Sequence, residues 1–101
     1  MDVHGFTASL AAPAPPAGLG RALEALWYEA KGDWARAHQL AQREKSAAGA
    51  WVHAYLHRVE GDTDNAAYWY RRAQRPVADG PVREEWAAIV KALLAGPAGA
   101  A

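Results

Sequence analysis

The chain has 101 residues, eleven basic and eleven acidic side chains that cancel at neutral pH, and no cysteine. This length allows one domain, and a hydrophobic content of 51% with five tryptophans predicts a packed core and excludes a disordered chain. Zero net charge removes the positive field of a nonspecific nucleic-acid binder, and the lack of cysteine excludes disulfides and cysteine-based zinc sites.

The first predicted segment is a flexible leader over residues 1–17. It lacks the cationic and apolar regions of a secretory signal and ends in AAPAPPAG, where three prolines favour extended backbone. A single helical domain is predicted over 18–95 and a flexible tail over 96–101. No window approaches the ~18 apolar residues of a membrane span, so we predict a cytoplasmic protein.

Five helices are predicted in chain order. Apolar residues at helical spacing place them over about 19–32, 34–46, 50–60, 63–74 and 82–95. Gly32 and Gly61 end the first and third helices, Asp33 caps the second helix, and Asp62 or Thr63 caps the fourth. No segment alternates apolar and polar residues with period two, so the predicted fold is all-α without a sheet.

An internal repeat relates two of the predicted helix pairs. EALWYEAKGDWARAHQLA aligns with HAYLHRVEGDTDNAAYWY, which superimposes Gly32 on Gly61 and Ala37 on Ala66, a period of 29 residues (61 minus 32). A period of this size indicates stacked helical hairpins, in which a Gly-Asp turn reverses the chain. The small alanine then allows the second helix of each hairpin to approach the first.

This pattern resembles the tetratricopeptide repeat. The second copy matches the motif at Gly61, Asp62, Ala66, Tyr70 and Ala73. The first copy has Ala41 at the aromatic position, and the period is shorter than that family's ~34 residues. The resemblance implies two antiparallel hairpins whose end surface is covered by the fifth helix as a cap, or by a homodimer. The stretch from Trp51 to Pro76 also resembles a small, chiefly bacterial family of uncharacterised proteins.

The resemblance also implies a ligand groove along the first helix of each hairpin. The repeat register places six side chains on that groove: Ala22, Leu26, Glu29, Trp51, Tyr55 and Arg58. Aromatic residues beside an arginine are typical of a binding hot spot. The predicted function is therefore a non-enzymatic interaction module that binds a protein or peptide segment, while the alternative places the tryptophan in the core.

A histidine pair is the second candidate site. His53 and His57 lie one helical turn apart with Glu60 on the same stripe, and His38 on the preceding helix is a possible fourth ligand. This pattern allows a zinc-like metal site. It lacks the glutamate beside the first histidine that makes the zinc-protease helix catalytic. The alternative is a pair of packed histidines.

A basic edge is the third candidate site. Arg71, Arg72 and Arg75 follow aromatic side chains in YWYRRAQR and could contact an anion or RNA, although a solvated helix edge gives the same pattern. Nucleic acid is not an expected partner, because no nucleic-acid-binding motif accompanies the neutral charge. No nucleophile elbow and no phosphate-binding glycine loop occurs, so we predict that the protein is not an enzyme.

Overall fold

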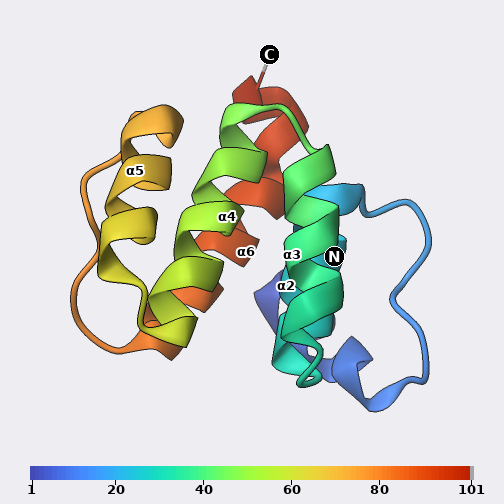
Figure 1. The fold of residues 1–101 in the computed structure, drawn as a ribbon. Coiled ribbons are helices and arrows are strands. Elements are labelled where there is room, and N and C mark those ends of the chain that lie inside the picture. Colours follow the sequence, from blue (N-terminus) through green and yellow to red (C-terminus); the bar gives the residue numbers. More distant parts are fainter. Residues whose placement is uncertain (101) are drawn as a thin grey trace.

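The computed structural model is all-α (Figure 1) and describes residues 1–100, with side chains described up to residue 96. Over these residues it contains no strand, which confirms the predicted fold class. The elements are α1 (Val3–Ala8), the 3-10 helix η1 (Ser9–Ala11), α2 (Arg21–Ala30), α3 (Trp34–Arg43), α4 (Ala47–Glu60), α5 (Thr63–Ala73) and α6 (Val82–Ala100). The predicted number of α-helices, five, is one too few, because α1 was not predicted.

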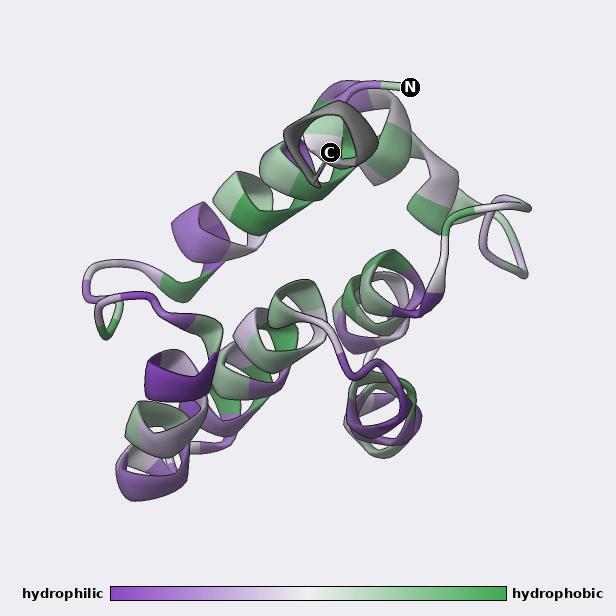
Figure 2. Ribbon diagram, turned by 90° about the horizontal axis from the view of Figure 1, so that it is seen from above, coloured by the Kyte–Doolittle hydropathy of each residue, from purple (hydrophilic) through white to green (hydrophobic). Residues whose placement is uncertain are grey.

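The helices lie in three layers. Helices α2 and α4 form the middle layer, with α3 and α5 on one side and α6 with α1 on the other, as Figure 2 shows. The two hairpins, α2–α3 and α4–α5, each bring consecutive helices into contact. Because α4 lies in the middle, every residue from Gly49 to His57 is buried. The core is therefore centred on α2 and α4.

Both hairpins reverse the chain through the same Gly-Asp turn. Gly32 and Gly61 have φ angles of 93° and 87°, in the left-handed region that glycine adopts without a steric penalty. Asp33 and Asp62 then cap α3 and α5 by accepting a hydrogen bond from the backbone N–H three residues later, at 3.1 and 3.2 Å. The predicted turns and caps are confirmed at both positions.

The connection between the hairpins lies three residues earlier in the chain than predicted. Helix α3 ends at Arg43 instead of Ser46, and α4 begins at Ala47. The reason is that Ser46 caps α4, its hydroxyl accepting a hydrogen bond from the backbone N–H of Gly49 at 3.2 Å. A Cβ atom on Gly49 would overlap the backbone carbonyl of Glu44, so this close approach requires glycine.

We predict that Gly49→Ala lowers the free energy of unfolding by about 1–3 kcal/mol, as expected for overpacking against fixed backbone. Urea unfolding followed by circular dichroism measures the change. Gly96→Ala is the matched control, because a Cβ atom there meets no heavy atom within 4 Å and alanine favours the helix. Equal unfolding midpoints for Gly49→Ala and wild type would contradict the proposed overlap.

The N-terminal segment is partly helical and contributes to the core. Asp2 caps α1 by accepting a hydrogen bond from the backbone N–H of Gly5 at 2.8 Å. Phe6 is fully buried, with its ring centroid 5.6 Å from that of Trp86 in α6. The segment predicted as a flexible leader, residues 1–17, therefore contains a helix that was not predicted, because a distant helix provides an apolar contact that local spacing does not reveal.

Helix α6 covers the face of α2 and α4 opposite α3 and α5. Ile89 and Val90 are fully buried, and the indole N–H of Trp86 donates to the backbone carbonyl of Leu26 at 3.0 Å. The helix begins at Val82, as predicted, but it continues through residues 96–100, where a tail was predicted. The last residue of that predicted tail, residue 101, lies outside the described part of the chain.

Candidate metal centre

Three histidine side chains converge between the middle layer and α3. One ring nitrogen from each of His38, His53 and His57 lies within 4.8 Å of the other two. The Nε2 atoms of His38 and His53 are 3.0 Å apart. His53 and His57 are 3% and 7% exposed, and His38 is half-buried. The structure therefore unites the predicted pair with the histidine that the sequence suggested as a further ligand.

Two tryptophans hold the histidine rings in place. The Trp34 ring stacks on His38 with centroids 4.8 Å apart, and the Trp69 ring from α5 stacks on His53 at 3.8 Å. Trp34 is itself fixed, because its indole N–H donates to the backbone carbonyl of Leu56 at 2.8 Å. The histidine rings consequently have little rotational freedom before any ligand arrives.

The surroundings of His53 and His38 disfavour their protonated forms. Burial lowers the pKa of His53 from 6.5 to about 4, and the neighbouring His38, His57 and Lys45 act in the same direction. Burial also lowers the pKa of His38, and His57 adds to that effect. Neutral imidazole is the form that binds a metal ion through a nitrogen lone pair.

One nitrogen in this cluster has no partner. The Nδ1 atom of His53 is the single buried side-chain nitrogen or oxygen without a hydrogen bond among the residues whose side chains are described. A neutral imidazole has one donor and one acceptor nitrogen, and only one of the two nitrogens of His53 has a hydrogen-bond partner. Buried groups of this kind are costly, and each requires an explanation.

Glu60 lies on the predicted stripe of α4, but it contacts a histidine ring. Its Oε1 atom accepts a hydrogen bond from Nδ1 of His57 at 2.7 Å. A carboxylate on one ring nitrogen fixes the tautomer and leaves Nε2 as the coordinating atom, as in many zinc–histidine–carboxylate arrangements. Glu60 therefore orients His57, and its predicted role as a direct ligand is replaced by this indirect one.

A second group of possible ligands is accounted for by ordinary hydrogen bonds. His57, Glu60 and Asp62 also bring one ligand atom each within 4.8 Å of one another. Asp62, however, caps α5 and accepts from both the backbone and side-chain nitrogens of Asn65, at 3.2 and 3.1 Å. The group at the α4–α5 turn therefore requires no metal ion to explain it.

The residues predicted to line a ligand groove lie beneath α6. Leu26 and Tyr55 are fully buried, Glu29 is 7% exposed and Trp51 is 8% exposed. Arg58 forms an ion pair with Glu85 of α6 at 2.9 Å. The expectation of an open groove does not hold, because α6 fills the face on which that groove would lie.

The three arginines of the basic edge do not converge on one point. The guanidinium of Arg75 lies 3.4 Å from the ring centroid of Trp51, while that of Arg72 lies 5.3 Å from Trp69. Arg72 also donates to the hydroxyl of Tyr68 at 3.1 Å. Two of the three guanidinium groups are therefore stacked on rings of the same molecule, and anion or RNA binding through Arg71, Arg72 and Arg75 stays a prediction.

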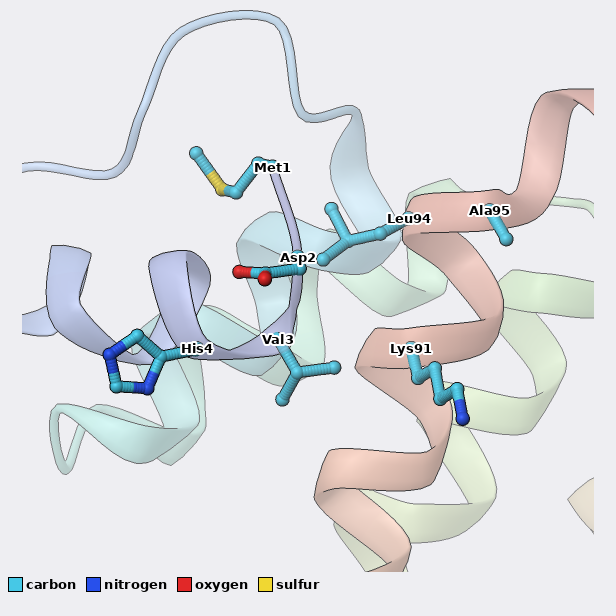
Figure 3. Close-up of a pocket in the computed structure, with 7 residues that line it drawn as sticks. All are labelled: Met1, Asp2, Val3, His4, Lys91, Leu94 and Ala95. Carbon is cyan, nitrogen blue, oxygen red and sulfur yellow. The ribbon is translucent and has the colours of Figure 1, made fainter.

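A surface hollow of about 390 Å³ lies where α1 meets the end of α6 (Figure 3). Its lining combines apolar side chains with Asp2, His4 and Lys91. The side chains of His4 and Lys91 point in different directions in Figure 3, and Asp2 is used as the cap of α1. These polar groups form no converging set, in contrast to the three buried histidines.

Comparison with known proteins gives no assignment: no family model, curated protein or solved structure matches the chain. The resemblances noted from the sequence therefore stay predictions. Among the described residues, no helix is both long enough and apolar enough to cross a membrane. Interpretation of function accordingly depends on the geometry of the chain itself.

Proposed function

We propose that this protein binds a divalent transition-metal ion of the zinc class through His38, His53 and His57. The observation that supports it is the convergence of three ring nitrogens within 4.8 Å, on two packed helices, with two of the three rings buried. Glu60 serves as the orienting carboxylate of His57. The proposed role of the ion is structural or regulatory, and no reaction is assigned to it.

The distance between the His38 and His53 nitrogens is close to that of two ligands on one ion. Two histidine nitrogens bound at 2.0–2.1 Å to a tetrahedral zinc ion are about 3.3 Å apart. The Nε2 atoms of His38 and His53 are 3.0 Å apart, so a shift of a few tenths of an ångström makes room for the ion.

The donor set favours particular ions. Three imidazoles with no thiolate and no directly coordinating carboxylate suit zinc, copper, nickel and cobalt, whereas magnesium and calcium prefer oxygen ligands. Three protein ligands also leave a fourth tetrahedral position for water or another small ligand. We expect selectivity for zinc-like ions over magnesium and calcium at equal concentrations.

For the scaffold that carries this site we propose two tetratricopeptide-like hairpins with α6 as the covering helix. Support comes from the identical Gly-Asp turns and from Ala37 and Ala66, which are 0% and 3% exposed at equivalent repeat positions. In this arrangement α6 lies along the inner helices α2 and α4. The scaffold is proposed to be non-enzymatic.

Titration calorimetry on chelator-treated, tag-free protein tests the metal site. We expect one zinc ion per chain for wild type, and no measurable binding for His53→Ala or His57→Ala. Glu60→Gln should weaken binding by about 10–100-fold, because an orienting carboxylate contributes on that scale.

His4→Ala is the matched control, since His4 is exposed in α1 and lies outside the cluster. Circular dichroism confirms that each variant remains folded. Absence of zinc binding by folded wild-type protein, or wild-type affinity in His53→Ala, would exclude the proposed site.

A further inference from the structure

Helix α3 has the fewest buried side chains of the four hairpin helices. Only Ala37 and Ala41 are buried among its ten residues, whereas α4 buries nine residues in succession. An alanine side chain offers a single methyl group, so it contributes little apolar area to an interface. Helix α3 lies in an outer layer, packed on α2 and α4 (Figure 2). Its position therefore depends strongly on its remaining contacts.

Several of its other contacts meet at the histidine cluster, while Leu40 packs on the core and the Arg36 guanidinium lies 4.4 Å from the ring centroid of Tyr28 in α2. Trp34 donates to the carbonyl of Leu56 on α4 and stacks on His38, which in turn contacts His53 on α4. His38 is the one proposed ligand that α3 supplies, and the other two both belong to α4. An ion in this site would therefore connect α3 to α4 directly.

The connection differs with and without an ion. In the metal-free protein, the 3.0 Å contact between the two Nε2 atoms is one hydrogen bond, with one ring as donor and the other as acceptor. With an ion, both nitrogens donate lone pairs to the metal, and His57 adds a third bond. The ion thereby replaces one neutral hydrogen bond with three coordinate bonds, one to α3 through His38 and two to α4 through His53 and His57.

The rest of the core is anchored without α3. Tyr55 of α4 donates to Glu29 of α2 at 3.0 Å, and Trp86 of α6 donates to the Leu26 carbonyl of α2. These bonds connect α2, α4 and α6 on the face opposite α3. Loosening of α3 therefore leaves a connected three-helix core in place.

We propose that metal occupancy of the His38–His53–His57 site controls the attachment of α3 to the α2–α4 layer. This inference rests on the proposed metal site and specifies what that site regulates. With the ion bound, α3 is held on its neighbours. Without the ion, α3 stays packed most of the time but opens locally more often, and each opening uncovers the faces of α2 and α4 that it covers, while α6 stays packed. In folded proteins, one element can open locally at a lower free-energy cost than global unfolding.

Hydrogen–deuterium exchange of the full chain, with and without one equivalent of zinc, tests the proposal. We expect zinc to slow exchange of the amides of Trp34–Arg43 at least tenfold and to leave the amides of α6 unchanged. Trypsin gives a second readout, because Arg36 and Arg43 are exposed cleavage sites within α3. Zinc should slow cleavage at both of these sites.

His38→Ala should abolish the zinc effect on α3, and the control His4→Ala should retain it. Calorimetry on the same samples shows whether zinc binds, independently of whether zinc protects α3. Zinc binding without protection of α3, or with equal protection of α3 and α6, overturns control of α3 and leaves the metal site in place. Failure of wild-type protein to bind zinc overturns both.

Discussion

Glu85→Gln is expected to lower the free energy of unfolding by about 3 kcal/mol, at the lower end of the cost of breaking a buried ion pair. Glu85 is 8% exposed and accepts hydrogen bonds from the Tyr70 hydroxyl at 2.6 Å and the Arg58 guanidinium at 2.9 Å. It also accepts from the Trp51 indole at 3.4 Å. An amide cannot neutralise Arg58, so the substitution leaves a mostly buried cation without its counter-charge.

The adjacent residue provides the control for this prediction. Glu84→Gln removes the same charge one position earlier in α6, where the side chain is exposed. We expect that variant to change the free energy of unfolding by less than about 0.5 kcal/mol. Urea unfolding of both variants measures the difference, and equal effects of the two substitutions would show that Glu85 is not an anchor of α6.

A second polar contact attaches α6 in a similar way. Arg83 donates to both carboxylate oxygens of Glu29 in α2, at 3.1 and 2.7 Å, and Glu29 also accepts from Tyr55. Arg83 is largely exposed, so this ion pair is screened by water and weaker than the one at Glu85. Together the two carboxylates fix the register of the first turn of α6 on α2 and α4.

Local features of this fold could be predicted from sequence, because their causes are local. A Gly-Asp pair contains both the left-handed turn and the helix cap, so the α2–α3 and α4–α5 reversals follow from the residues themselves. The burial of Trp51 and Tyr55 could not be deduced in the same way. Helical spacing shows that they share one face, but the same spacing fits a face covered by α6 and a face open to a partner.

The same distinction applies to the candidate metal centre. The i, i+4 spacing of His53 and His57 placed both rings on one helical face from sequence alone. Glu60 lies on the same stripe, yet its role depends on which ring nitrogen it contacts, and that is set by side-chain rotamers. Stacking of Trp69 on His53 depends on the packing of α5 against α4, which is a tertiary property.

In metal-free protein, lowering the pH from about 6.5 to about 4 is expected to reduce the free energy of unfolding by about 3 kcal/mol through His53. The pKa of His53 falls from 6.5 to about 4 on folding, because burial disfavours the charged ring and His38 and His57 act in the same direction. Between these two values the unfolded chain binds a proton that the folded protein excludes. Stability therefore falls as the pH decreases through this window, and His53 contributes no further loss below it.

Urea unfolding at pH 7 and pH 4.5, with chelator present, measures this effect. His53→Gln replaces the ring with an uncharged side chain, so the variant should lose most of the difference between the two pH values, while His4→Gln should keep it. The remaining dependence in His53→Gln should have the same sign, because burial also lowers the pKa of His38. Equal pH dependence of stability in wild type and His53→Gln would mean that folding does not lower the pKa of His53. In that case its neutrality could not be the reason that the cluster is ready to bind a metal ion.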